Sequence, residues 1–211
     1  MKDKYILTAE SVTAGHPDKL CDTIADNVLD ACLKEDPNAR VACEVLATAG
    51  KILVAGELRT TASPDVEAIV RQTVQKGGYD CNYNVEVRLH TQSPDIAGAV
   101  DGDTLGAGDQ GIMYGYACWE TVELLPAPVV LANHITSLLT TCREEKLISG
   151  MGPDGKAQVS VQYAFGVPER VNTIVISCQH DADKDPDELR EELRKLVIAR
   201  ACHDVRIDEN T

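Results

Sequence analysis

An apolar stripe that repeats every four residues, directly after a proline, constrains the first half of this chain most strongly. Leu20, Ile24, Val28 and Cys32 follow Pro17 at this spacing, which places them on one face of an amphipathic helix. Proline is favoured at the first helical position, where an N–H group would have no partner within the helix. The spacing therefore predicts a long helix that begins at Pro17 and is anchored by one apolar face.

Strand patterns flank a second helix in the first hundred residues. Residues 41–58 contain two apolar runs separated by Ala49-Gly50-Lys51 and predict a β-hairpin, and residues 85–91 predict another strand. Between them, Ser63-Pro64-Asp65 has the N-cap and first-turn residues of a helix that ends at Gly77-Gly78. With a strand before Pro17, this half is expected to be a β-α-β-β-α-β unit of the α+β class, with its helices on one face of a sheet.

The second half repeats this alternation weakly. A long helix is expected at about 128–145, and a charged helix is expected from Pro186 to Ala201. Between them, residues 159–165 alternate apolar and polar side chains through Phe165, and the chain returns through a hairpin at Val167-Pro168-Glu169-Arg170. This half is therefore also expected to be α+β.

Composition limits the class of partner. The chain has 20 Lys and Arg against 34 Asp and Glu, for a formal charge of −14, which disfavours broad binding to nucleic acid or to an anionic membrane. A polyphosphate ligand would need local lysines, helix termini and a bound divalent metal. We see no signal peptide and no run of about 18 apolar residues. The eight cysteines occur singly, without zinc spacing, so we expect reduced thiols in a cytoplasmic protein.

Two glycine-rich stretches match G-x-G-x-x-G without the context that this motif requires. Gly106–Gly111 follows a loop rather than a strand, and Gly150–Gly155 contains Pro153 and joins a helix to a strand. No P-loop motif is present. A generic nucleotide-binding protein is thus disfavoured, and residues 97–111 are better interpreted as a boundary between two halves and a candidate active-site lid.

The stretch Gly15-His16-Pro17-Asp18-Lys19 places an imidazole, a carboxylate and an ammonium where a loop becomes a helix. The first turn of a helix attracts anions, so His16 and Lys19 would add donors, and Asp18 could hold a cation beside them. Taken alone, these residues also suit a capped helix start with surface charges. Other polar residues in loops and strands are candidates of the same kind: Glu10, Glu44, Glu57, Gln92, Asp95, Asp109 and Lys156.

In order and spacing, four strings resemble the S-adenosylmethionine synthetase (methionine adenosyltransferase) family: TAESVTAGHPDK, QSPDIAGAV, GAGDQG and DGKAQV. The resemblance runs from Tyr5 to about Gln179. It implies an enzyme that joins ATP to L-methionine: the methionine sulfur attacks C5′ of ATP and releases triphosphate, which is then hydrolysed to pyrophosphate and phosphate. It also implies the cofactors Mg²⁺ and K⁺.

The resemblance also implies roles for individual residues. On the ATP side, His16 contacts the triphosphate, Lys156 binds phosphate, Asp18 ligates Mg²⁺ and Glu10 lies near metal and substrate. The methionine pocket and the potassium site correspond to the following residues: Glu57, Gln92 and Asp109 on the methionine side, with Asp109 also close to phosphate, and Glu44 at K⁺.

Architecture follows from the same resemblance. Family members have three similar α+β domains about a pseudo-threefold axis and form homodimers or homotetramers with active sites between subunits. We expect a first segment at 1–97, a gating loop at 98–111 and a second segment at 112–211, with the third segment missing. The site would then be incomplete in this chain. The alternative is a catalytically inactive dimerising or regulatory module of the same fold.

Overall fold

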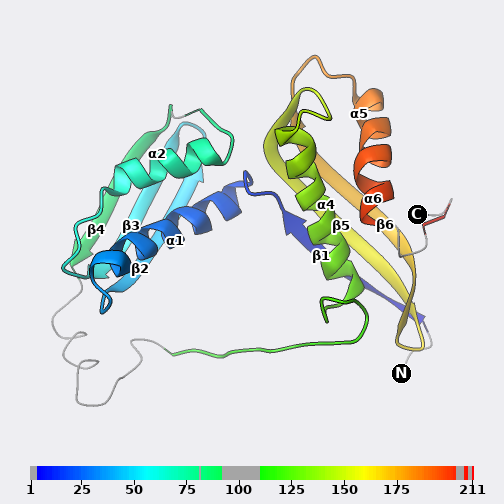
Figure 1. The fold of residues 1–211 in the computed structure, drawn as a ribbon, viewed down its shortest axis with the longest axis horizontal. Helices are drawn as coiled ribbons and strands as arrows, with labels where there is room; N and C mark the ends of the chain where they lie inside the picture. Colours follow the sequence, from blue (N-terminus) through cyan, green and yellow to red (C-terminus); the bar gives the residue numbers. More distant parts are fainter. Residues whose placement is uncertain (1–3, 81, 92–109, 203–206, 209–210) are drawn as a thin grey trace. The chain divides into compact units, whose positions relative to one another are not determined.

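The computed structural model describes residues 4–80, 82–91, 110–202, 207–208 and 211. They belong to two units (Figure 1): the first contains Met1–His16 and Tyr116–Thr211, and the second contains Pro17–Gly115. Each unit pairs one sheet with helices on one of its faces, as Figure 1 shows. Within the described residues, no helix has the length and apolar character needed to cross a membrane. The mixed α+β class expected from the sequence is confirmed.

The second unit consists of five elements. They are α1 (Pro17–Glu35), β2 (Arg40–Thr48), β3 (Lys51–Arg59), α2 (Val66–Lys76) and β4 (Asn84–Thr91). The hairpin β2–β3 is antiparallel, and β4 joins the other edge of β3 in parallel, giving the order β2-β3-β4. The helix α2 provides the crossover that a parallel pair requires.

The helix α1 begins at Pro17 and buries its apolar stripe, as the sequence predicts. Leu20 is 5% exposed, and the other three stripe residues are fully buried. They pack with buried residues of β3 and α2, namely Ile52, Val54, Val66, Val70 and Val74. The four-residue period therefore identified the buried face of this helix correctly.

The helix α2 begins later than expected. Its N-cap is Asp65, whose side chain accepts a hydrogen bond from the Ala68 N–H at 3.0 Å. Ser63 and Pro64 precede the helix, so Ser63 is not its N-cap and Pro64 is not its first residue. The expected N-cap, Ser63, was wrong. A capping side chain accepts a hydrogen bond from a free backbone N–H two or three residues later, and Asp65 does this for the Ala68 N–H.

The first unit also has a three-stranded sheet covered on one face. Its elements are β1 (Lys4–Val12), α4 (Ala127–Glu144), β5 (Met151–Ala164), β6 (Val167–His180), α5 (Pro186–Leu193), a π-helical turn (Arg194–Ile198) and α6 (Ala199–Ala201). The strand order is β1-β5-β6, and all pairs are antiparallel. The last three elements form the expected charged helix, with a π-helical turn in its middle. Phe165 lies in the β5–β6 turn and is 81% exposed, so the apolar alternation ends at Tyr163 rather than at Phe165.

The sequence pattern did not reveal the partner of the first strand. We expected β1 to belong to the sheet of the first hundred residues, but it pairs with β5 over its full length, from Lys4 opposite Ala164 to Val12 opposite Lys156. Alternation of side chains predicts that a strand exists and which face is buried, but not which strand lies beside it. The consequence is that residues from opposite ends of the sequence become neighbours.

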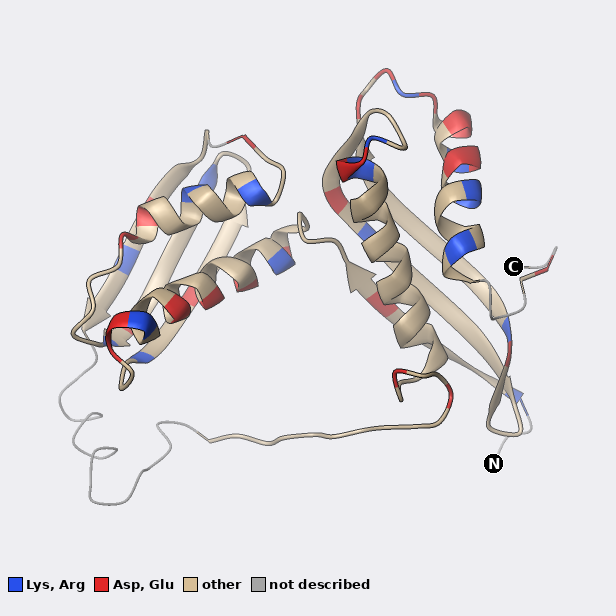
Figure 2. Cartoon of the chain, viewed as in Figure 1, with Lys and Arg blue, Asp and Glu red and all other residues tan. Residues whose placement is uncertain are grey.

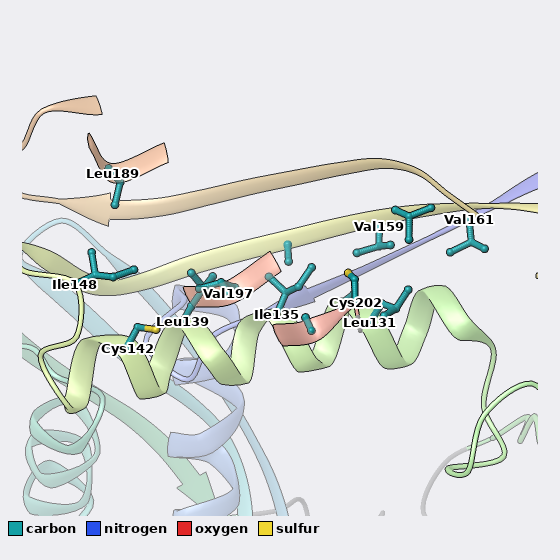
Figure 3. Close-up of a cluster of buried hydrophobic side chains, with 14 of the residues drawn as sticks. Leu131, Ile135, Leu139, Cys142, Ile148, Val159, Val161, Leu189, Val197 and Cys202 are labelled. Carbon is teal, nitrogen blue, oxygen red and sulfur yellow. The ribbon is translucent and has the colours of Figure 1, made fainter. Parts of the chain in front are cut away.

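The core of the first unit lies between its sheet and its helices. Figure 3 shows side chains from α4, β5 and the C-terminal helix turned toward one another. The fully buried members include Ile135, Val159, Val161, Tyr163 and Val197. Burial of these large side chains drives the covering helices onto one face of the sheet and leaves the other face open.

Glu120 connects the start of α4 to this core. Its Oε2 accepts hydrogen bonds from the Tyr163 hydroxyl at 2.5 Å and from the Ala127 N–H at 2.9 Å. The N-cap residue of α4, Pro126, provides no side-chain hydrogen bond, so Glu120 supplies the acceptor that the helix lacks locally. Burial, followed by the hydrogen bond to Glu120, raises the pKa of Tyr163 well above its usual value.

This raised pKa predicts a loss of stability in alkali. An unfolded tyrosine deprotonates near pH 10, whereas folded Tyr163 keeps its proton, so the stabilisation is complete below pH 10 and declines above it. The slope is about 1.4 kcal/mol per pH unit. We expect the free energy of unfolding, measured in urea at pH 8 and pH 11, to fall more in the unsubstituted chain than in Tyr163→Phe. Equal declines would contradict this account, because the other tyrosines are common to both proteins.

An acidic row follows the exposed side of α1 (Figure 2). Asp18, Asp22, Asp26 and Asp30 recur at intervals of four residues and are all exposed. Like charges at this spacing repel one another. Replacing Asp26 with lysine turns two repulsive pairs into attractive ones, so we expect the melting temperature of the second unit to rise by about 2–5 °C in low salt. The gain should shrink in 0.5 M salt, and a salt-independent gain would argue against an electrostatic cause.

Candidate functional site

Two candidate residues meet across β1 and β5. The Lys156 ammonium lies 2.7 Å from Glu10 Oε2, and both side chains are about half exposed, at 44% and 49%. In the ladder, Lys156 is opposite Val12 and Glu10 is opposite Gln158, so the pair is diagonal. It lies on the face opposite the hydrophobic core residues of β5, such as Ala157 and Val159. An exposed ion pair of this kind is weak, and its lysine can exchange the carboxylate for another anion.

The loop that carries His16 is hydrogen-bonded to the beginning of β5. The Thr13 N–H donates to the Gly155 carbonyl at 2.9 Å, and the Thr13 hydroxyl donates to the Pro153 carbonyl at 2.8 Å. Gly15 is buried against Pro153, and a Cβ at this position would lie 2.6 Å from the Pro153 Cβ and closer still to its carbonyl oxygen. Glycine is therefore required where the loop crosses the strand. As a result, the loop before α1 is held one to three residues from Lys156 along β5.

Asp18 and Lys19 lie in the first turn of α1, directly after this loop, and both side chains are exposed. His16 is half-buried, and its N–H donates to the Thr13 carbonyl at 3.1 Å. The positive end of α1 thus follows His16 immediately in the chain. This local arrangement agrees with the helix start expected at Pro17.

Glu44 and Glu57 belong to the second unit. Both are exposed, and they lie on the sheet face opposite its buried core: Glu44 is opposite Ala55, and Glu57 is beside Ala42 and His90 in the two ladders. Gly56, which precedes Glu57, has a φ of +143°, a conformation that residues with a Cβ rarely adopt. These two carboxylates therefore lie on an open sheet surface.

Three candidates, Gln92, Asp95 and Asp109, lie outside the described residues, as does most of the expected loop 97–111. Within the described ranges, no three His, Cys, Asp or Glu side chains form a group suited to a metal ion. A Mg²⁺ ion bound with phosphates usually needs only one or two carboxylates and keeps several waters. Asp18 or Glu10 could provide such a donor.

Thr13 and Glu120 were missed by sequence reasoning. Thr13 lies inside one of the family-like strings, but its importance depends on contacts with residues 140 and 142 positions away. Glu120 caps a helix that begins seven residues later, beyond the three-residue spacing of a normal capping box. No local sequence signal would have identified either contact.

The first unit carries two groups that could bind an anion. An exposed ammonium on β5 and an imidazole in a loop fastened to the same strand can donate to phosphate oxygens, and such charge-assisted hydrogen bonds are stronger than neutral ones. The chain has a net charge of −14, so these donors would have to attract an anion against the negative potential of the protein as a whole. The fold is therefore α+β, with candidate anion donors on β5 and on the loop between β1 and α1.

Comparison with known proteins identifies the family. The N-terminal domain model of S-adenosylmethionine synthetase matches residues 4–102, and the central domain model matches residues 104–211. The chain belongs to the S-adenosylmethionine synthetase family. The resemblance noted in the sequence is thus confirmed over nearly the whole chain.

Curated relatives named S-adenosylmethionine synthase agree. The chain is 44% identical to the protein of Finegoldia magna over 225 residues, covering 97% of this chain and 57% of the relative. It is 44% identical to the protein of a Sulfurovum species over 223 residues, covering 100% and 58%. For Prochlorococcus marinus, the identity is 45% over 212 residues, covering 92% and 52%. The chain therefore spans a little more than half the length of these relatives.

Proposed function

We propose that this chain takes part in the synthesis of S-adenosylmethionine from ATP and L-methionine, with release of pyrophosphate and phosphate. The observation that supports this most directly is the fastening of the His16 loop to the strand that carries Lys156, within a chain that matches two domains of the family. Both residues occupy positions that the family resemblance assigns to the triphosphate.

The role of these residues follows from the charge that develops during the reaction. When the methionine sulfur attacks C5′, the C5′–O bond breaks and its electron pair leaves with the triphosphate. Donors that hold this leaving group lower the barrier, provided that they bind it more strongly as its charge grows. Lys156 would donate to a phosphate oxygen, and His16 would donate near the oxygen that departs from C5′.

Metal ions fit the available donors. Asp18 would bind Mg²⁺ together with phosphate oxygens, since Mg²⁺ prefers one or two carboxylates with waters and substrate oxygens. Glu10 is a further candidate metal ligand. Glu44 would bind K⁺. When bound, Mg²⁺ would neutralise charge on the triphosphate, which suits a protein that is acidic overall.

The methionine side of the reaction is assigned to Glu57, Gln92 and Asp109. Carboxylates at the first and last of these positions would hold the ammonium group of methionine, and Asp109 would also lie close to phosphate. Of these three residues, Glu57 is in the described part of the chain, where it is exposed on the open face of its sheet. We propose a homodimer or homotetramer as the assembled form.

A product assay tests this function. The purified chain is incubated with ATP, methionine, Mg²⁺ and K⁺, and S-adenosylmethionine and pyrophosphate are measured by mass spectrometry. We expect S-adenosylmethionine to form with the unsubstituted chain and to be lost in His16→Ala, because His16 would hold the departing triphosphate. Equal amounts of product from the two proteins would contradict the role of His16, and no product from the unsubstituted chain would contradict the proposed function.

A catalytically inactive dimerising module is the second candidate. It is favoured by the open sheet face of the second unit, where Leu46 is 59% exposed opposite Leu53, on the face that also carries Ala42 and Ala55. This alternative predicts a dimer in analytical ultracentrifugation and no binding of an ATP analogue. The catalytic proposal instead predicts Mg²⁺-dependent binding that His16→Ala and Lys156→Ala weaken.

A further inference from the structure

Thr13 makes three backbone-directed hydrogen bonds between β1 and α1. Its N–H donates to the Gly155 carbonyl, its hydroxyl donates to the Pro153 carbonyl, and its own carbonyl accepts from the His16 N–H at 3.1 Å. The residue is 5% exposed. One buried residue therefore joins the strand before Lys156 to the backbone of His16.

The shape of Thr13 matters as well as its hydroxyl. A Cβ added to Gly155 would lie 2.9 Å from the Thr13 Cγ2 methyl, so this methyl fills the space that a side chain at position 155 would need. Serine keeps the hydroxyl but loses the methyl, whereas valine keeps the branched shape but leaves the Pro153 carbonyl without this donor. The two substitutions separate packing from hydrogen bonding.

The hydrogen bond from the Thr13 hydroxyl to the Pro153 carbonyl lies beside a close backbone contact. Gly15 crosses Pro153 so closely that a Cβ does not fit, and the Thr13 hydroxyl binds the carbonyl of the same proline. Without this hydrogen bond, the backbone at Gly15 can shift relative to Pro153. His16 comes directly after Gly15 in the chain, so it would shift as well. Small displacements of a group that binds developing charge weaken catalysis strongly.

We propose that Thr13 is a positioning residue for His16: through its hydroxyl and backbone, it holds the imidazole-bearing loop in register with Lys156 on β5. This inference rests on the proposed function for its meaning in catalysis. The positioning itself is a property of the ligand-free chain and can be measured without substrate.

Hydrogen exchange of the His16 amide tests the positioning. In the 211-residue chain, we expect Thr13→Val to accelerate exchange of this amide at least tenfold, while the amides of Val159 and Val161 in the middle of β5 stay protected. Thr13→Ser should remain within about threefold of the unsubstituted chain, since it keeps the donor. The matched control is Thr73→Val, which removes the hydroxyl of another buried threonine, in the second unit, and should leave His16 exchange unchanged.

Titration with inorganic tripolyphosphate separates this inference from the proposed function. If Thr13 positions His16, Thr13→Val weakens tripolyphosphate binding about tenfold, whereas Thr13→Ser binds tripolyphosphate about as tightly as the unsubstituted chain. Unchanged His16 exchange in Thr13→Val would overturn the positioning role, and so would equal acceleration in Thr13→Ser and Thr13→Val. If the unsubstituted chain does not bind tripolyphosphate, the proposed function fails, while the exchange measurement still decides the role of Thr13.

Discussion

Replacing Gly15 with alanine is expected to lower the free energy of unfolding of the first unit by about 2–3 kcal/mol and to abolish tripolyphosphate binding. The new Cβ would overlap the Cβ and carbonyl of Pro153, and a backbone carbonyl cannot move aside as a flexible side chain can. Either the loop or the start of β5 must shift, and both carry a proposed phosphate ligand. Urea unfolding and calorimetric titration measure the two effects.

Gly115→Ala is the matched control for this substitution. A Cβ at Gly115 meets no atom within 4 Å, so its effect on stability and binding should be small. If Gly15→Ala were as stable as Gly115→Ala and still bound tripolyphosphate, the close crossing of Gly15 over Pro153 would not hold the loop.

Replacing Lys156 with glutamine is expected to weaken tripolyphosphate binding about 10- to 100-fold without unfolding the chain. The Lys156 side chain is 44% exposed and forms an exposed ion pair with Glu10, so its loss costs little stability. Loss of a charged donor to a phosphate costs far more in binding. Isothermal titration calorimetry at fixed ionic strength measures the change.

Two further variants test whether this effect is specific. Lys195→Gln removes an exposed positive charge from the same unit and should leave the affinity within about twofold. Glu10→Gln should raise the affinity in the absence of Mg²⁺, because it frees Lys156 and removes a repelling carboxylate. If Lys195→Gln weakened binding as much as Lys156→Gln, the effect would come from net charge rather than from a site.

The sequence predicted those parts of the fold that depend on local spacing. The start of α1 at Pro17, its buried stripe, the β2–β3 hairpin and the helix at 127–144 follow from residue periodicity and turn chemistry, and all are present. The start of α2 was missed by two residues, because Ser63 and Asp65 both resemble caps and only the position of the free N–H groups decides between them.

The long-range contacts could not be predicted in the same way. Pairing of β1 with β5 joins residues about 150 positions apart, and nothing in the pattern of either strand specifies the other. The proximity of the His16 loop to Lys156 depends entirely on this pairing. Family resemblance assigned both residues to one ligand, whereas periodicity alone left them as two unrelated polar residues.

The central claim is that His16 and Lys156 belong to a site for the triphosphate of ATP, and one titration tests it directly. The magnesium complex of a non-hydrolysable ATP analogue is titrated into the unsubstituted chain and into His16→Ala, with far-UV circular dichroism to confirm that both are folded. Our account predicts saturable, Mg²⁺-dependent binding to the unsubstituted chain that is at least tenfold weaker in His16→Ala. Equal binding by the two proteins, or no binding by the unsubstituted chain, would contradict it.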